Sequence, residues 1–292
     1  MNLDFFKWTH IIYMIKALFF DIDGTLVSFR THKIPQSTVE AITMAKNMGI
    51  KVYISTGHPR QLIDNINEIS HLVDGYITVN GAYCFEGEEI ISFHPIPEAN
   101  VRKVLSLADE MNFACMVVGK NDLVMYHDNE SADRIFRQML NVHGLSEDVP
   151  VESVLEQSVL QLTPVISQED EELIMRSLPD CTSCRWHPDF ADVTMKSADK
   201  GMGLSAIIAR HGIKIEETMA FGDGGNDMSI IKKAGIGVAM GNANEPLKDV
   251  ADYITDSVDE DGIYKALKRW IFPKLGCLIF FIWMFHFYGI YV

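Results

Sequence analysis

Short apolar runs recur in the first and last thirds of the chain, and most are followed by a segment with helical spacing of apolar residues. The strands that this pattern predicts are residues 15–20, 51–55, 75–79, 218–221 and 236–240. The predicted helices are residues 37–48, 201–211, 227–234 and 260–270, with a further helical stretch between the second and third strands. Strands that alternate with helices form parallel sheets covered by helices on both faces. The two regions together predict a doubly wound α/β core.

The pattern changes between these two regions, where helices and strands follow one another without the βαβ rhythm. Residues 97–111 have helical spacing, with their apolar side chains on one side. The other predicted segments are strands at residues 113–118, 123–127, 159–166 and 182–186, and helices at 131–140 and 169–178. This mixture predicts an α+β domain inserted into the core. The insertion is expected at residues 83–188, and the core at residues 14–82 and 189–270.

The two ends of the chain, residues 1–13 and 271–292, are predicted to be extensions outside both domains. Residues 1–13 are apolar but lack the basic start of a signal peptide. Residues 277–292 are strongly apolar, and these sixteen residues are fewer than the roughly 20 that span a bilayer. An appendage or a packed extension is therefore preferred over a membrane anchor, and we expect a cytoplasmic protein.

The composition restricts the partners of this protein. It has 40 acidic and 25 basic residues, a formal charge of −15 and a pI of about 5.0. Such a surface repels nucleic acid, and a phosphate ester would need a locally positive site made of a metal ion, a lysine or helix N-termini. The five cysteines have no disulfide-framework spacing, which is typical of a reducing compartment. The pair Cys181 and Cys184 is interpreted as ordinary strand or turn residues, because no second pair accompanies it.

The strongest chemical signal is Asp21-Ile22-Asp23-Gly24-Thr25, directly after the first apolar run. Aspartates at i and i+2 point the same way beyond the carboxyl end of a strand, where open α/β sheets bind ligands. One carboxylate can attack phosphorus, and the other can protonate the leaving group and then deprotonate water. Gly24 permits a sharp turn, and Thr25 can hydrogen-bond the turn or a phosphate. An Asp-rich turn with no chemistry is the alternative for this segment alone.

A second acidic segment, Gly222-Asp223-Gly224-Gly225-Asn226-Asp227, also follows a predicted strand and opens a helix. Its glycines allow close backbone approach, and Asp223 and Asp227 offer hard oxygen ligands. Because Mg²⁺ takes few carboxylates and keeps several waters, Asp21 and Asp223 with help from Asp227 would suffice to bind it. An Asx turn explains this segment in isolation, but the two acidic segments together favour a metal site.

Two weaker signals complete the set. Thr56-Gly57 follows the second predicted strand and offers a hydroxyl and an N–H to a phosphate oxygen. Lys200 opens a predicted helix and would supply a positive charge to a phosphoryl group. Each is common in proteins without such a role, so both assignments depend on the two acidic segments.

These four segments occur in the order of the four motifs of the haloacid dehalogenase-like superfamily, which the chain resembles over roughly residues 14–270. The insertion, with Asn80-Gly81-Ala82 before it and residues 191–194 after it, resembles the cap (type C2B) of the Cof-type sugar-phosphate phosphatases. The resemblance implies a Rossmann-like core and Mg²⁺-dependent hydrolysis of phosphate monoesters through an aspartyl-phosphate.

The resemblance also implies roles for individual residues. Asp21 would be the nucleophile and a metal ligand, and Asp23 the general acid/base that touches the metal through its backbone carbonyl. Asp223 would complete the metal site and Asp227 would steady it. The remaining roles are phosphate binding, which would fall to Thr25, Thr56, Gly57, Lys200 and Asn226. The acid Asp23 argues against dehalogenase chemistry, because a halide needs no proton to leave.

One position departs from the family. Relatives commonly have arginine after the Thr-Gly pair, whereas this chain has His58, so the bidentate donor of an arginine is missing. Arg60 or His58 itself is expected to replace it in part, which leaves the affinity and pH dependence open.

The substrate is less specified than the chemistry. The cap is expected to select it, with Tyr83, Tyr126, His127, Trp186 and His187 as candidate contacts that could equally be packing or surface residues. A hexose phosphate is the first expectation, and pyridoxal phosphate or a flavin-precursor phosphate is the alternative. A catalytically weak sugar-phosphate sensor, tethered through residues 277–292, is the alternative of another class. The partner is a small phosphorylated molecule, and a monomer or small homo-oligomer is expected.

Overall fold

A computed structural model describes residues 15–140, 142, 145–146 and 149–272 of the chain. The described chain divides into two compact units. The first contains residues 15–53, 66–74 and 212–272, and the second contains residues 54–65 and 75–211 except for the few positions not described. The apolar segment at residues 277–292, for which a membrane anchor was the less favoured interpretation, lies outside the described residues.

The first unit is built on a parallel sheet with the strand order β13-β12-β11-β1-β2. Its strands are β1 (Ala17–Phe20), β2 (Lys51–Ser55), whose last two residues belong to the second unit, β11 (Thr218–Gly222), β12 (Ile236–Ala239) and β13 (Tyr253–Ile254). Strand β1 pairs in parallel with β11, with Phe20 opposite Phe221. Every residue of β1 and β11 is buried, which is typical of central strands covered on both faces.

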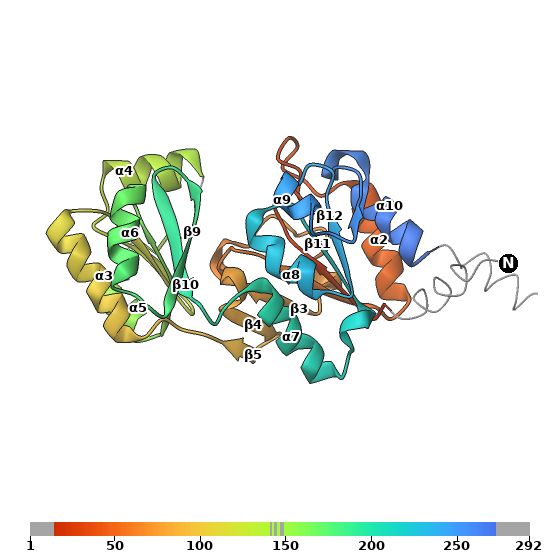
Figure 1. The fold of residues 1–292 in the computed structure, drawn as a ribbon, viewed down its shortest axis with the longest axis horizontal. Helices are drawn as coiled ribbons and strands as arrows, with labels where there is room; N and C mark the ends of the chain where they lie inside the picture. Colours follow the sequence, from red (N-terminus) through yellow and green to blue (C-terminus); the bar gives the residue numbers. More distant parts are fainter. Residues whose placement is uncertain (1–14, 141, 143–144, 147–148, 273–292) are drawn as a thin grey trace, which may run out of the picture. The chain divides into compact units, whose positions relative to one another are not determined.

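Helices cover this sheet on both faces (Figure 1). They are α2 (Gln36–Asn47), α8 (Met228–Lys233), α9 (Glu245–Lys248) and α10 (Gly262–Trp270), with 3₁₀ turns at Ser70–Leu72, Ile215–Glu217, Gly225–Asp227 and Val258–Glu260. Helices α2 and α10 pack against each other, whereas α8 packs on β11 and β12. After α2, Gly49 adopts a φ of +80°, the left-handed conformation that ends many helices. The Rossmann-like doubly wound core expected from the sequence is confirmed.

The second unit begins with an antiparallel arrangement of β3 (Gly75–Thr78), β4 (Tyr83–Glu86) and β5 (Glu89–Phe93). Helix α7 (Lys200–His211) packs against all three strands and against the 3₁₀ turn Val79–Gly81. A further 3₁₀ turn, Arg60–Leu62, follows the end of β2.

The inserted α+β domain is a five-stranded antiparallel sheet with the order β7-β6-β8-β10-β9. The strands are β6 (Cys115–Gly119), β7 (Leu123–Tyr126), β8 (Val159–Pro164), β9 (Cys181–His187) and β10 (Phe190–Met195). The helices are α3 (Glu98–Met111), α4 (Glu130–Ala132) continued by the π-helix η4 (Asp133–Met139), α5 (Val151–Leu155) and α6 (Gln168–Arg176).

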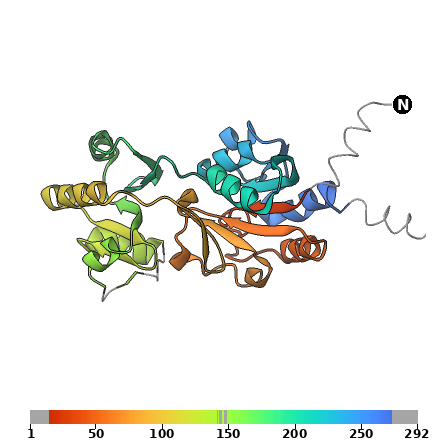
Figure 2. The same ribbon diagram turned by 90° about the horizontal axis from the view of Figure 1, so that it is seen from below.

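The two faces of this sheet have separate apolar clusters. Helices α3, α5 and α6 pack on one face, where they cover Val117 and Leu162. Segment α4–η4 packs on the opposite face, where it covers Met116 and Val118 (Figures 1 and 2).

Most of the predicted elements are present within a few residues of their predicted limits. The prediction of a helical stretch between residues 57 and 75 is wrong, because this segment forms only the 3₁₀ turns Arg60–Leu62 and Ser70–Leu72. The elements that were not predicted include the strands β4, β5, β10 and β13 and the short helices α5 and α9. Strands β4 and β5 mix aromatic and charged residues without a clean alternation, so the spacing of apolar residues did not predict them.

Cys181 is buried and Cys184 is exposed, because the two residues project from opposite faces of β9. Both are free thiols, which agrees with their interpretation as ordinary strand residues. Among the described residues, no helix has the length and apolar character needed to cross a membrane.

Candidate active site

The loop after β1 presents Asp21 and Asp23. The backbone N–H of Asp21 donates to the carbonyl of Phe221 on the neighbouring strand at 3.1 Å. The chain then turns tightly, since the N–H groups of Leu26 and Val27 both donate to the carbonyl of Ile22, at 2.9 and 2.8 Å. Asp23 is half-buried and forms an isolated bridge with Val27. Backbone hydrogen bonds therefore fix the acidic loop at the carboxyl end of β1.

The loop after β11 presents Asp223 and Asp227. The carboxylate of Asp227 is fully buried, and its Oδ2 accepts hydrogen bonds from the N–H groups of Asp223 and Gly224, both at 3.0 Å. This oxygen holds the turn that presents Asp223. Asn226, the expected phosphate-binding residue, is exposed in the same turn.

Asp21, Asp223 and Asp227 form one cluster, in which a carboxylate oxygen of each lies within 4.8 Å of the others. Two unit charges at such a distance repel by roughly 3 kcal/mol at an effective dielectric constant of 20. Glycines make the necessary room: a Cβ at Gly24, which has a φ of +78°, would lie 2.2 Å from Asp223 Oδ2. The gathered carboxylates supply the hard oxygen donors that Mg²⁺ prefers, so the cluster fits a divalent cation.

Asn242 links the two acidic loops, and the sequence analysis missed it. Its Nδ2 donates to the carbonyl of Gly24 at 2.8 Å and to Asp223 Oδ2 at 3.3 Å, while its Oδ1 accepts from the N–H of Val258 at 3.0 Å. Two residues on, the N–H of Asn244 donates to the carbonyl of Asp223 at 3.1 Å. The only signal in the sequence was a Gly-Asn-Ala-Asn turn after a strand, which is common in proteins.

Thr25 is fully buried, and its Oγ1 has no hydrogen-bond partner among the described residues. Its N–H donates to the carbonyl of Ile22 at 3.3 Å within the same tight turn. A buried hydroxyl without a partner costs free energy, so this position has an unused hydrogen-bonding capacity beside the acidic loops.

Within the second unit, the segment Thr56-Gly57-His58 is fastened to the turn that follows β3. The N–H of Thr56 donates to the carbonyl of Ile77, and the N–H of Asn80 donates back to the carbonyl of Thr56, at 2.8 and 3.1 Å. Thr56 Oγ1 accepts from the N–H of His58 at 3.1 Å.

The turn that follows β3 is itself unusual. Val79, Asn80 and Gly81 all have positive φ, at 51°, 50° and 97°. This conformation is strained for a β-branched residue such as Val79, and such strain is concentrated at functional sites.

Lys200 is fully buried at the first turn of α7. The preceding residue, Asp199, caps this helix: its Oδ1 accepts from the N–H of Met202 at 2.8 Å. The backbone of Asp199 lies so close to Gly81 that a Cβ there would be 2.2 Å from the Asp199 carbonyl oxygen. Gly81 and Asp199 together fix where α7, and therefore Lys200, begins.

The predicted site residues thus lie in two groups. Asp21, Asp223 and Asp227 are brought together in the first unit, with Asp23, Thr25 and Asn226 in the same loops. Thr56, Gly57 and Lys200 belong to the second unit, in the segments described above.

The aromatic residues and histidines named as candidate substrate contacts in the insertion differ in burial and in their partners. Tyr83 is buried against Phe85 and Phe93 and has a packing role. Tyr126 and His127 both contact Asp109, at 2.7 and 3.0 Å. His187 stacks on Phe190, whereas Trp186 is 58 % exposed.

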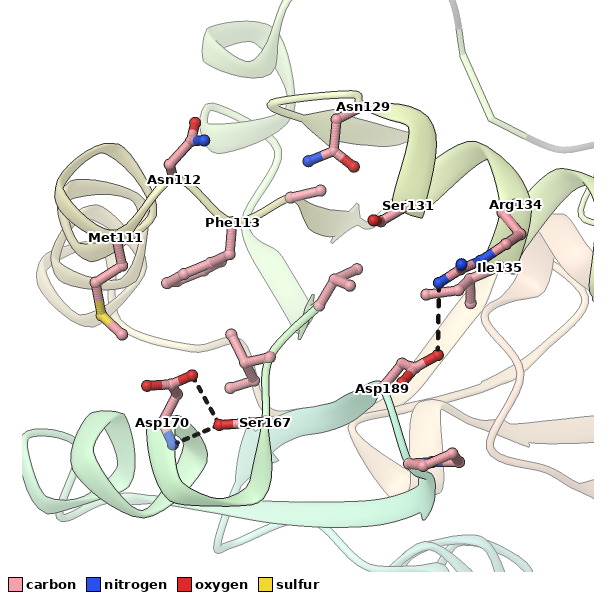
Figure 3. Close-up of a pocket in the computed structure, with 14 residues that line it drawn as sticks. Met111, Asn112, Phe113, Asn129, Ser131, Arg134, Ile135, Ser167, Asp170 and Asp189 are labelled. Carbon is pink, nitrogen blue, oxygen red and sulfur yellow. Dashed lines mark hydrogen bonds and ion pairs between the residues drawn. The ribbon is translucent and has the colours of Figure 1, made fainter.

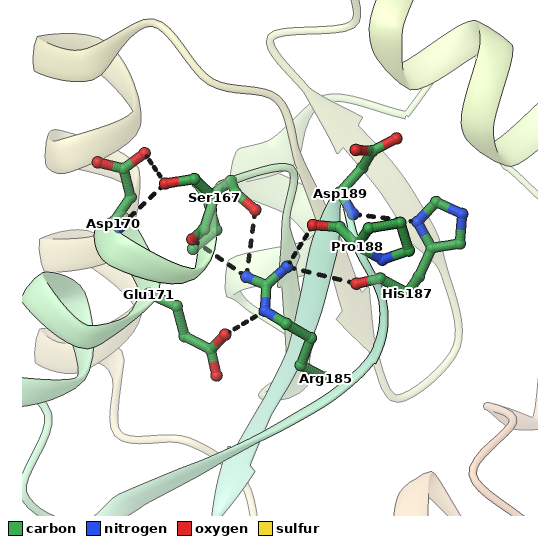
Figure 4. Close-up of polar contacts among 8 residues, drawn as sticks. Ser167, Asp170, Glu171, Arg185, His187, Pro188 and Asp189 are labelled. Carbon is green, nitrogen blue, oxygen red and sulfur yellow. Dashed lines mark hydrogen bonds and ion pairs between the residues drawn. The ribbon is translucent and has the colours of Figure 1, made fainter.

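The second unit also contains an open recess of about 460 Å³ between α3, α4 and the loop before α6 (Figure 3). Its charged and polar groups are used internally: Arg134 pairs with Asp189 at 4.0 Å, and Ser167 hydrogen-bonds Asp170. Beside it, Arg185 pairs with Glu171 and donates to the carbonyls of Ile166, Ser167, His187 and Pro188 (Figure 4). Arg185 therefore joins two loops of the insertion, and the paired polar groups around the recess stabilise the domain.

Comparisons with known proteins agree with this geometry. The family model described as haloacid dehalogenase-like hydrolase matches residues 18–267. The solved structure of BT4131, named a subclass IIB sugar phosphatase, is similar with 47% identity and a TM-score of 0.79, over 87% of this chain and 98% of that one. YkrA of Bacillus subtilis, named as a candidate phosphatase, is 32% identical over 87% of this chain and 97% of its own length. YcsE of Bacillus subtilis, named a 5-amino-6-(5-phospho-D-ribitylamino)uracil phosphatase, is 27% identical over 88% of this chain and 96% of its own length.

Proposed function

This chain belongs to the haloacid dehalogenase-like hydrolase family and is a phosphatase, and we propose that it uses Mg²⁺ to hydrolyse sugar phosphates through an aspartyl-phosphate. The observation that carries the proposal is the cluster of Asp21, Asp223 and Asp227 beside the half-buried acid Asp23. The sequence similarity to a protein named a sugar phosphatase supports the substrate class.

The first step that we propose is attack by a carboxylate oxygen of Asp21 on the phosphorus of the ester. The bond between phosphorus and the ester oxygen breaks, and Asp23 gives its proton to the leaving oxygen. In the second step Asp23 takes a proton from water, the water oxygen attacks phosphorus, and inorganic phosphate leaves with Asp21 regenerated.

The other residues bind and orient. Asp21, Asp223 and the backbone carbonyl of Asp23 would hold Mg²⁺, with Asp227 fixing the turn. Bound there, Mg²⁺ would neutralise charge on the phosphoryl oxygens. We propose that the phosphate is contacted by Thr25, Thr56, Gly57, Lys200 and Asn226. We also propose that the inserted domain comprises residues 83–188, as predicted from the sequence.

The experiment is phosphate release from a panel of hexose phosphates, pyridoxal phosphate, a flavin-precursor phosphate and nucleotides, with Mg²⁺ or with EDTA. We expect turnover of hexose phosphates that EDTA abolishes and that falls by about 10⁴-fold in Asp21→Asn. The similarity to YcsE makes the flavin precursor the second candidate, and its preferential hydrolysis would replace the sugar phosphate as substrate. Full activity in EDTA, or in Asp21→Asn, would contradict the mechanism.

A further inference from the structure

The loop that follows the acidic turn after β1 carries an exposed phenyl ring. Phe29 is 65 % exposed, the largest exposed fraction among the large apolar residues of the described chain. A single exposed apolar residue is ordinary on a protein surface. Phe29 differs from such residues in its position, because it lies beside the cluster of Asp21, Asp223 and Asp227.

The surroundings of Gly24 define how close the ring is to this cluster. A Cβ placed on Gly24 would lie 2.7 Å from Phe29 Cε2 and closer still to Asp223 Oδ2. The phenyl ring and the carboxylate therefore approach the same point of the chain, and only a glycine leaves room for both. Cε2 is an edge atom, and the edge of an aromatic ring carries positive potential, so its place beside a carboxylate is favourable. The ring therefore borders the acidic cluster within the first unit.

Hydrogen bonds within the loop hold the backbone that carries the phenyl ring. The N–H of Ser28 donates to the carbonyl of Lys33 at 3.1 Å, and the N–H of His32 donates back to the carbonyl of Ser28 at 2.8 Å. The Oγ of Ser28 accepts from the N–H groups of Arg30 and Thr31, at 3.1 and 3.2 Å. These contacts close the loop into a tight turn, so the ring is presented from a fixed backbone.

The same loop is joined to the acidic cluster by a second route. Ser28 Oγ and Arg30 Nη2 both donate to Asp259 Oδ1, at 2.8 and 3.1 Å. The N–H of the residue before Asp259 donates to Asn242 Oδ1 at 3.0 Å, and Asn242 Nδ2 donates to Asp223 Oδ2 at 3.3 Å. The position of the ring relative to the cluster is therefore fixed by contacts within the first unit.

An apolar surface beside a charged centre suits a phosphate ester better than a phosphate ion. The proposed reaction brings the phosphoryl group to the acidic cluster, where Asp21 attacks phosphorus. The leaving group is joined to phosphorus by a single oxygen, so its carbon atoms lie next to the same centre. Replacing water on an exposed phenyl ring by carbon atoms is favourable. The ring therefore offers a contact to the part of the substrate that carries no charge.

We propose that Phe29 binds the carbon surface of the substrate's leaving group, so that the chain prefers phosphate esters of ring-shaped or aromatic molecules over those with a small leaving group. This inference rests on the proposed function. It assigns part of the specificity to the first unit itself, through an apolar contact rather than a charge.

The test compares p-nitrophenyl phosphate, whose leaving group is an aromatic ring, with acetyl phosphate, whose leaving group has a single methyl group. Phe29→Ala is expected to raise KM for p-nitrophenyl phosphate by about tenfold and to change kcat by less than about twofold, because the lost contact is the same in the ground state and the transition state. KM for acetyl phosphate should change by less than about twofold. Phe29→Tyr keeps the ring and should retain the KM of the wild type for both substrates.

Met48→Ala is the matched control. Met48 is a 47 % exposed apolar residue of the same unit, and it precedes the amino end of β2, whereas Asp21 follows the carboxyl end of β1. This variant should leave both values of KM unchanged. A loss of kcat on both substrates in Phe29→Ala is what a merely structural role predicts, and it would overturn the inference. An unchanged KM for p-nitrophenyl phosphate would overturn it as well.

Failure of the proposed function has a separate readout. If the wild type hydrolyses no phosphate ester, the proposed function fails, and Phe29 is judged by binding alone. Calorimetry with phenylphosphonate and methylphosphonate then measures the contact. The wild type should bind phenylphosphonate about tenfold more tightly than methylphosphonate, and Phe29→Ala should bind the two equally. Equal binding of the two by the wild type, or binding of neither, would overturn the inference.

Discussion

Two acidic centres within the described residues have opposite surroundings. In the first unit, Asp21, Asp223 and Asp227 gather their carboxylates within 4.8 Å of one another. In the second unit, Asp192 is surrounded by uncharged donors from Gln161, Thr163 and Trp186. Like charges held together favour a cation, whereas uncharged donors stabilise a single carboxylate without one. The first centre therefore calls for a bound cation, whereas the second is stabilised by hydrogen bonds within its own unit.

The largest effect that separates the two centres should come from Asp223→Asn. We expect turnover to fall by about 10³-fold or more, because a ligand of the proposed cation is lost. Without metal this variant should melt about 2–4 °C above the wild type, since mutual repulsion of the carboxylates is relieved. Saturating Mg²⁺ should raise the melting temperature of the wild type by about 5–10 °C and leave Asp223→Asn nearly unchanged.

Differential scanning fluorimetry with and without Mg²⁺ measures these shifts, and Asp192→Asn serves as the comparison. It should retain the full stabilisation by Mg²⁺. If Asp192→Asn loses that stabilisation, or if Asp223→Asn keeps it, the assignment of the cation to the first centre is wrong.

A smaller effect should come from Asn242→Ala. Asn242 contacts Gly24 and Asp223 but contributes no carboxylate, so we expect it to orient the site. Loss of such an orienting contact should raise the dissociation constant for Mg²⁺ by about tenfold, as measured by calorimetry. The control is Asn244→Ala, which removes the N-cap of α9 but keeps the backbone contact to Asp223. It should cost about 1 kcal/mol of stability and leave Mg²⁺ binding unchanged. Equal Mg²⁺ affinities in both variants would refute the orienting role.

The smallest effect concerns the pH dependence of stability at Asp192. Burial raises the pKa of this carboxyl above its ordinary value of 3.8, although Trp186, Thr163 and His58 counteract the rise. Between the unfolded value and the raised folded value, the folded state binds more protons than the unfolded state. The stability of the wild type relative to Asp192→Asn should therefore rise as the pH falls through the folded pKa, and reach its limit below about 3.8. Urea denaturation of both proteins from pH 7 to pH 4 measures the difference, and an opposite slope would contradict the assigned direction.

The two centres also differ in how far the sequence predicts them. Asp21 and Asp223 each follow an apolar strand within a short acidic motif, and adjacent parallel strands bring their carboxyl ends to one edge. The pattern of residues was therefore enough to predict that Asp21, Asp223 and Asp227 lie together. Asp192 lies on β10, which was not predicted as a strand, and its partners lie on β8 and β9. Their proximity depends on the register between strands, which short-range periodicity does not contain.

Prediction of the fold from short-range sequence patterns has the same limit. Strands β1, β2 and β11 were predicted because buried parallel strands are continuous apolar runs. The segment between β2 and β3 was expected to be a helix but forms only two 3₁₀ turns. Proline at position 59 and the contacts of Thr56 and Asn80 with each other hold this segment in a turn, against the helical spacing of its apolar residues.

The close approach of Gly81 and Asp199 has a consequence for the modular exchange of domains. Residues 82–198 leave and return through two points whose backbones are in contact, and the pair His94 and Ser197, at 3.3 Å, joins the outgoing and returning chain again. The entropic cost of closing such a segment grows only slowly with its length, by about 0.6 kcal/mol for each doubling. Strands β4 and β5 lie inside this segment but continue the sheet from β3 and pack on α7, so the second junction, at His94 and Ser197, is the natural boundary for grafting the insertion of a relative. Such a chimera would keep Gly81, because any larger residue would push the two junctions apart.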